Sequence, residues 1–268
     1  MKYLNFENLK IASDFALRAS CFNPMSGHSH AKTIAHAKGI ADQKRGAAFS
    51  KMVRLITVAV KEGGANPEIN SRLRMALDQA KGINMPKDNI ERAIARATGP
   101  GEGEIFYDFL FEGYGPGNVA LLVEGITDNK NRAVNDVKTI LNQNNGKMVG
   151  EGAVRWMFER KGMVIVKLED QPENKQNKES LEMDAIEAGA DDIYWFENIL
   201  EVRTAPENAE VVKKTLEEKG IKVESFSLAW MPKEEVAGDE KIREQNEKLI
   251  EKLTDNDSVQ EVYSNLKD

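Results

Sequence analysis

From Ser26 to Ala97 the apolar residues recur at intervals of three and four, which is the repeat of an amphipathic helix. The pattern is clearest at five positions that share one helical face: Phe49, Met52, Val53, Ile56 and Val60. Lysines and arginines occupy the opposite side of the same helix. The pattern therefore predicts a helix with one buried face and one cationic face.

Glycine and proline mark the ends of further helices in this region. Gly63-Gly64 is expected to end the first helix. Asn66-Pro67-Glu68 has the N-cap, the proline and the acidic residue of a helix start, and Met85-Pro86-Lys87-Asp88 is expected to open another helix that ends at Gly99. Together they predict a small helical bundle, followed by a linker over residues 99–103.

After residue 103 the pattern changes to short apolar runs of the length of β-strands. Two of them flank Gly113–Gly117, whose glycines can adopt the positive φ angles of a hairpin turn. A helix of about 15 residues is expected from Asn131. The strands expected in this region are 105–112, 119–126 and 153–158.

The segment after Gly162 alternates strands and helices in the order β-α-β-β-α-β. Strands are expected at 163–168, 193–196, 199–203 and 223–229, with helices at 180–188 and 208–219. This order is typical of the ferredoxin-like fold, in which two helices cover one face of an antiparallel sheet. A charged helix at 239–253 and a strand at 259–263 follow, and we expect both to return to the sheet formed by residues 104–160.

These elements predict an α+β protein with an N-terminal helical bundle and two α/β domains with antiparallel sheets, the last one ferredoxin-like and inserted in the middle one. The predicted divisions are an extension at 1–24, expected to be dispensable, a basic helical domain at 25–98, a discontinuous domain at 99–160 plus 232–268, and an inserted domain at 161–231. Residues 1–24 lack the continuous apolar stretch of a secretory signal, so no export is expected. A docking or targeting helix is the alternative for these residues.

Charge is unevenly distributed along the chain. The whole sequence has 37 Lys and Arg against 44 Asp and Glu, a net charge of −7. Residues 26–97 carry 13 basic and 6 acidic residues, whereas residues 98–268 carry 21 and 36. Because a local cluster of cations can bind phosphates even on an acidic protein, the basic part is the candidate nucleic-acid-binding region. An ordinary solvated charged face is the alternative.

The candidate contact residues for nucleic acid lie in and around the first predicted helix. They are His28, Lys32, His36, Lys38, Lys44, Arg45, Lys51, Arg54 and Lys61. Histidine also binds metal ions, and all three histidines of the chain fall within nine residues. However, no Cys, Asp or Glu between residues 24 and 40 completes a ligand set, so contact with nucleic acid or a surface role is favoured over a metal site.

The sequence assembles no catalytic or cofactor site. Gly113–Gly117 lacks the Gly-Lys-Ser/Thr ending of a P-loop, and Glu112, Glu124 and Asp128 have no nucleophile or metal ligand placed beside them. The single cysteine, Cys21, fits a reducing compartment, and no apolar run reaches the roughly 18 residues of a membrane span. We expect a cytoplasmic protein that is not an enzyme and has no cofactor, metal, membrane contact or small-molecule substrate.

Several short motifs resemble those of one known family. They are Gly27-His28-Ser29, Asp42-Gln43-Lys44-Arg45-Gly46, Glu62-Gly63-Gly64, Asn84-Met85-Pro86, Glu112–Gly117 and Thr127–Arg132. In order and number they resemble the YebC/PmpR family, over about Met25 to the C-terminus. Where that family often has Lys-Trp after Gly-His-Ser, this chain has His30-Ala31, so a stacking side chain and a fixed charge are missing here.

The resemblance implies three domains, a cytoplasmic location and no cofactor. Members of the family are described as DNA-binding transcriptional regulators, and others, including a mitochondrial translational activator, as ribosome-associated factors that assist synthesis through proline-containing stretches. We therefore expect a gene-expression factor that binds nucleic acid, with a DNA-binding transcriptional regulator as the first interpretation. The alternatives are a translation factor that contacts the ribosome through rRNA or tRNA, and a protein-interaction scaffold that uses the acidic sheets.

Overall fold

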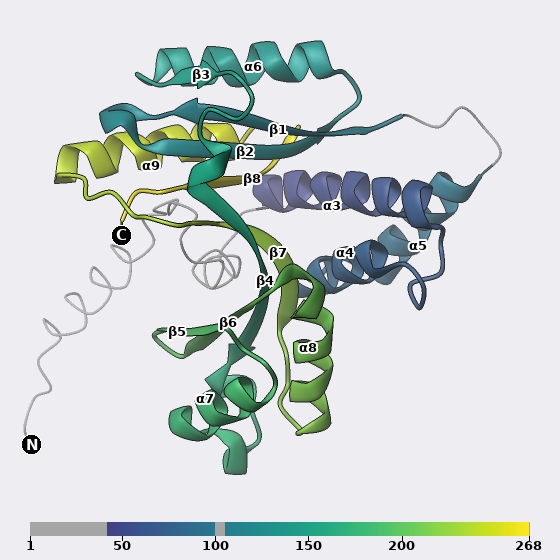
Figure 1. Ribbon diagram of the computed structural model, residues 1–268. Coiled ribbons are helices and arrows are strands. Elements are labelled where there is room, and N and C mark those ends of the chain that lie inside the picture. The colour runs from purple at the N-terminus through teal and green to yellow at the C-terminus, as the bar shows by residue number, and fades with distance from the viewer. Residues whose placement is uncertain (1–41, 100–104, 268) are drawn as a thin grey trace, which may run out of the picture.

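The computed structural model describes residues 42–99 and 105–267. This part of the chain begins with the helices α3 (Asp42–Gly63), α4 (Ser71–Gly82) and α5 (Lys87–Thr98) (Figure 1). Their apolar faces meet in one cluster that contains the buried residues Ile56, Leu73 and Ala93. The helical bundle that the apolar spacing predicts is therefore present.

The start of α4 differs from the expectation. Asn66-Pro67-Glu68 forms a turn, and the helix begins only after the N-cap Asn70. The buried Asn70 side chain accepts a hydrogen bond from the first turn of α4 and donates two, to the carbonyls of Ala59 and Gly64. Asn70 thus caps α4 and also satisfies carbonyls at the end of α3. These contacts fix the start of α4 after Asn70, although Asn66-Pro67-Glu68 has the sequence of a helix start.

Two four-stranded antiparallel sheets make up much of the remaining described chain, in the strand orders β3-β1-β2-β8 and β5-β6-β4-β7. The strands of the first sheet are β1 (Tyr107–Tyr114), β2 (Ala120–Thr127), β3 (Lys147–Val149) and β8 (Val259–Ser264). Those of the second sheet are β4 (Phe158–Lys167), β5 (Asp192–Phe196), β6 (Ile199–Thr204) and β7 (Ser225–Pro232).

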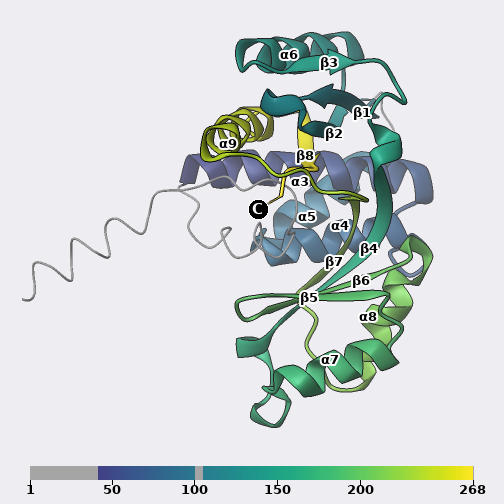
Figure 2. The ribbon, with the colours of Figure 1, turned by 60° about the vertical axis from the view of Figure 1, so that its left-hand side comes forward.

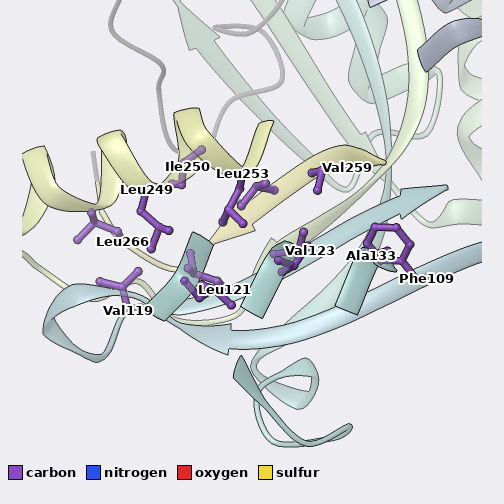
Figure 3. Packing of buried hydrophobic residues seen from close by; sticks show 13 residues of the cluster. Phe109, Val119, Leu121, Val123, Ala133, Leu249, Ile250, Leu253, Val259 and Leu266 are labelled. Atoms are coloured by element: carbon purple, nitrogen blue, oxygen red, sulfur yellow. The ribbon is translucent and has the colours of Figure 1, made fainter. Parts of the chain in front are cut away.

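Helices pack against one face of each sheet. On the first sheet, α6 (Lys130–Gln143) and α9 (Glu240–Thr254) share a core with the strands, in which Leu121, Ala133 and Leu253 are fully buried (Figure 3). On the second sheet, α7 (Lys178–Glu187) and α8 (Ala209–Glu218) pack together over the strands. The order β4-α7-β5-β6-α8-β7 and its strand arrangement are those of a ferredoxin-like unit, which confirms the predicted fold class.

The predicted hairpin turn between β1 and β2 is present as well. Gly117 has a φ of 74°, in the left-handed region that glycine adopts readily. A Cβ atom on Gly117 would also lie 2.9 Å from the side chain of Ile242 in α9. The backbone angle and the close approach of α9 therefore both require glycine at this position.

The expected strand at 153–158 is wrong. Residues 155–157 form a single 3-10 turn, and β4 begins at Phe158. The third strand of the first sheet is instead β3, which pairs with β1. The carboxylate of Glu112, which is 3% exposed, accepts hydrogen bonds from the backbone amides of Gly152, Val154 and Arg155. These bonds hold the segment as a loop, because its amides point at a side chain and not at a neighbouring strand.

The two sheets are joined by the long pair formed by β4 and β7. This pair runs from Phe158 opposite Pro232 to Ile165 opposite Ser225. After β7 the chain returns to the first sheet, as the sequence predicted, and β8 pairs there with β2. The domain boundaries expected near residues 161 and 231 fall within these strands, and the division into domains stays a prediction.

The helical bundle contacts both sheets (Figures 1 and 2). α3 lies beside β8, where Gln260 donates a hydrogen bond to the Lys51 carbonyl, and Met75 of α4 packs against the core of the second sheet. None of the described helices combines the length and apolar composition that crossing a bilayer requires.

Candidate nucleic-acid interface

The structure describes only part of the predicted contact set. His28, Lys32, His36 and Lys38 lie outside the described residues, and so does the side chain of Lys44. The side chains that can be placed all belong to α3: Arg45, Lys51, Arg54 and Lys61. Arg45 and Lys61 are exposed, whereas Lys51 and Arg54 are only partly exposed.

Lys51 and Arg54 contact the turn between α9 and β8. The Lys51 ammonium donates a hydrogen bond to the carbonyl of Thr254, and the Arg54 guanidinium donates to the carbonyl of Asp257, whose carboxylate lies 3.9 Å away. Burial lowers the pKa of Lys51, and the nearby carboxylates of Glu261 and Asp257 oppose this effect. At these two positions the cationic face of α3 therefore attaches the bundle to the acidic part of the chain.

Other charged contacts attach the bundle in the same way. Three further ion pairs join it to the rest of the chain: Arg72–Asp108, Arg74–Glu210 and Asp78–Lys213. The first is bidentate, with both carboxylate oxygens 2.8 Å from the same guanidinium nitrogen. The acidic part of the chain thus neutralises Arg72 and Arg74 of the bundle, whereas in the third pair the carboxylate belongs to the bundle.

A groove of about 180 Å³ runs between α3 and α5. Its described lining consists of apolar and uncharged polar side chains and two arginines of α5, and none of these residues carries a carboxylate. The lining residues are Phe49, Ser50, Val53, Met85, Asn89, Arg92, Ala93 and Arg96.

The two arginines of the groove are one helical turn apart, and both are exposed. Arg92 donates hydrogen bonds to the Asn89 side chain and the Asp88 carbonyl, which hold its guanidinium near the start of α5. Arg96 takes part in no hydrogen bond or ion pair with the residues that the structure describes. Guanidinium groups in such a position match the oxygens of a phosphate, to which arginine can donate two parallel hydrogen bonds.

Arg92 and Arg96 were not among the residues predicted from the sequence. The signal was available, because they repeat at a spacing of four on the side of α5 opposite its apolar residues Ile90 and Ala97. What the sequence alone did not provide is the position of α5 beside α3. The two arginines line a groove because α5 packs beside α3.

The three carboxylates beside the hairpin turn have structural partners. Glu112 accepts the three amide hydrogen bonds described above, and although burial alone would raise its pKa, these donors lower it. Glu124 accepts hydrogen bonds from Arg160 and from the hydroxyl of Tyr263, each at 3.1 Å, and Asp128 pairs with an arginine of α6. Within the described ranges, no group of three or more His, Cys, Asp or Glu side chains is arranged to hold a metal ion.

Comparisons with known proteins agree with the resemblance seen in the motifs. A family model described as the TACO1/YebC protein N-terminal domain matches residues 29–100, and one described as the TACO1/YebC second and third domain matches residues 106–266. Relatives from Halothermothrix orenii and Geotalea uraniireducens, each named "Probable transcriptional regulatory protein", are 46% and 47% identical; the alignments cover 90% of this chain and 94% and 95% of theirs. A crystal structure of a conserved hypothetical protein from Aquifex aeolicus has a TM-score of 0.78 and 38% identity, covering 90% of this chain and 94% of that one. The chain therefore belongs to the TACO1/YebC family.

Proposed function

We propose that the protein is a DNA-binding transcriptional regulator that holds a sugar-phosphate backbone along the groove between α3 and α5. The names of its relatives support a regulatory role. The observation that carries the proposal is the pair Arg92 and Arg96, exposed along a groove whose described lining has no carboxylate, on a chain of net charge −7. A polyanion is repelled by the protein as a whole, so binding requires a local surface of this kind.

The proposal extends the contact set predicted from the sequence. Lys51 and Arg54 donate to carbonyls of the chain itself, so they offer fewer donors to a phosphate than α5 does. Arg45 lies one turn before Phe49 of the groove, on the same side of α3, and extends the cationic rim beyond α5. The proposed interface is therefore centred on Arg92 and Arg96, with Arg45 at its edge.

The test replaces both arginines of α5 with alanine and measures binding of a labelled DNA duplex over a range of salt concentrations. Each phosphate contact releases counterions, so the loss of two contacts should make the slope of log K against log salt shallower by roughly 1.8. Between about 50 and 200 mM salt this corresponds to roughly a tenfold smaller fall in affinity. Affinity at low salt should fall as well.

A matched double variant controls for loss of charge. Lys81 and Lys87 are also exposed in the bundle, but they pair with Asp78 and Glu91 in their own helices. Replacing both with alanine removes the same charge outside the groove and should leave the slope nearly unchanged. Equal slopes for the wild type and the Arg92/Arg96 variant would reject the groove as the binding surface.

The ribosome-associated alternative is separated by competition. A transcriptional regulator should retain a duplex selected from a random pool against an excess of random duplex, because specific binding exceeds nonspecific binding by orders of magnitude. Displacement by random duplex as readily as by the selected one, with stronger displacement by a folded rRNA fragment, would reject DNA as the partner.

A further inference from the structure

An exposed tryptophan lies outside the helical bundle, in the segment between β3 and β4. Trp156 belongs to the 3-10 turn Arg155–Met157, and 64% of its surface is exposed. Its Nε1 donates a hydrogen bond to the carbonyl of Ala153 at 3.0 Å. The polar group of the indole is thus satisfied within the loop, and the exposed surface of the side chain is largely its aromatic ring.

The loop that carries Trp156 is held in one conformation. The buried carboxylate of Glu112 accepts hydrogen bonds from the amides of Gly152, Val154 and Arg155 at 2.6, 2.7 and 2.9 Å. Val154 itself is fully buried in the core between the two sheets. Because the backbone is already ordered, a flat ligand that stacks on the ring would cost little conformational entropy.

Two cationic residues belong to the turn of Trp156 or are hydrogen-bonded to it through the backbone. The exposed Arg155 precedes Trp156 and places its guanidinium over the ring of Trp230, 5.1 Å from the centroid. The backbone amide of Lys233 donates to the Met157 carbonyl at 2.8 Å, which brings the exposed Lys233 next to the same turn.

The loop is less acidic than the region around it. Residues 151–157 contain one basic and one acidic residue, in a part of the chain (98–268) that has 21 and 36. Glu234 and Glu235 follow Lys233, so the cationic character depends on individual side chains and not on a broad patch. An exposed aromatic face matches a nucleobase, and a cation of the same turn matches its phosphate, so we expect the ring to supply most of the affinity.

We propose that Trp156 is a stacking platform for an unpaired nucleobase, with Arg155 and Lys233 beside the phosphate of the same nucleotide. The inference rests on the proposed binding of nucleic acid and adds a second contact site, in the loop between β3 and β4. Bases within a duplex are stacked on both faces and offer none to a side chain, so the site discriminates between unpaired and paired nucleotides. Unpaired bases occur both in locally melted DNA and in RNA loops.

The test compares Trp156→Ala with the wild type on three labelled probes of one sequence: single-stranded DNA, single-stranded RNA and duplex DNA. Stacking is worth about 1–3 kcal/mol per base, so the affinity for the single strands should fall by roughly 5- to 150-fold. Duplex affinity should not change, and neither should the salt slope, because no charge is removed. Trp156→Phe should retain most of the single-strand affinity, since it keeps an aromatic face.

Met183→Ala is the matched control, because Met183 is 58% exposed on α7, away from the loop. Equal losses on both single strands would support stacking independent of the sugar, and a loss on RNA alone would support RNA as the source of the base. The inference is overturned if Trp156→Ala binds single strands like the wild type, if duplex affinity falls equally, or if the wild type binds no single strand. The duplex titration of the Arg92/Arg96 variant still tests the proposed function in each of these cases.

Discussion

Replacing Glu261 with glutamine should change how the stability of the protein depends on pH. Glu261 of β8 lies directly opposite Glu124 of β2 in the sheet, and Lys51 of α3 is the nearby cation. Burial raises the pKa of Glu261 from 4.5 to about 7; Lys51 opposes this rise and Glu124 adds to it. Burial, and to a lesser extent the facing carboxylate of Glu124, thus make the ionised form of Glu261 unfavourable.

The sign and size of the effect follow from these values. Between about pH 4.5 and 7 the folded chain holds a proton on Glu261 that the unfolded chain releases, so stability falls as the pH rises through this window. At about 1.36 kcal/mol per pH unit, the full shift corresponds to roughly 3 kcal/mol. Because the side chain is partly exposed, we expect about 1–2 kcal/mol. Glutamine resembles the protonated carboxyl at every pH, so the variant should match the wild type below about pH 4 and exceed its stability by that amount at pH 8.

Urea unfolding at about pH 4, 5, 6, 7 and 8 measures this difference. Glu244→Gln is a suitable control, because Glu244 is an exposed carboxylate on α9, away from the sheet interface. The reasoning is refuted if Glu261→Gln and the wild type show the same pH dependence. It is also refuted if the variant is less stable at pH 8, since attraction to Lys51 would then outweigh burial.

Three further changes test other parts of the structure. Glu112→Gln weakens three amide hydrogen bonds and should destabilise the fold by about 2–4 kcal/mol in urea unfolding; because the pKa of Glu112 is lowered, its contribution is present above pH 4.5 and is lost as the pH falls through the lowered pKa. Gly125→Ala places a Cβ 2.2 Å from a ring atom and from a backbone carbonyl and should lower the melting temperature sharply, whereas Gly150→Ala meets nothing within 4 Å and should not. Lys51→Ala with Arg54→Ala should lower stability by about 1–3 kcal/mol and leave the salt slope of DNA binding unchanged; a shallower slope with unchanged stability would contradict the contacts with the α9–β8 turn.

The parts of the fold that the sequence predicted are those whose signal is local. The face of α3 and the strands and helices of the ferredoxin-like unit each show their own periodicity, so their order was sufficient to infer the arrangement. β3 has only the residues Lys147–Val149, too few to show alternation. The loop before β4 looked like a strand because its sequence is rich in apolar residues, and it is a loop because of Glu112, about 40 residues earlier in the chain.

The same limit explains why the candidate interface moved from α3 towards α5. A charge count records how many cations a segment has, but it does not record which of them fold against carboxylates or carbonyls. Lys51 and Arg54 are each 203 residues away from the atoms that they bind, so no sequence window contains both partners. Arg92 and Arg96 remain exposed because α5 packs into the bundle through its apolar residues, such as Ala93, and the two arginines lie outside this contact. Part of the uneven charge of the chain therefore serves the docking of the bundle, and the proposed interface uses cations that this docking leaves exposed.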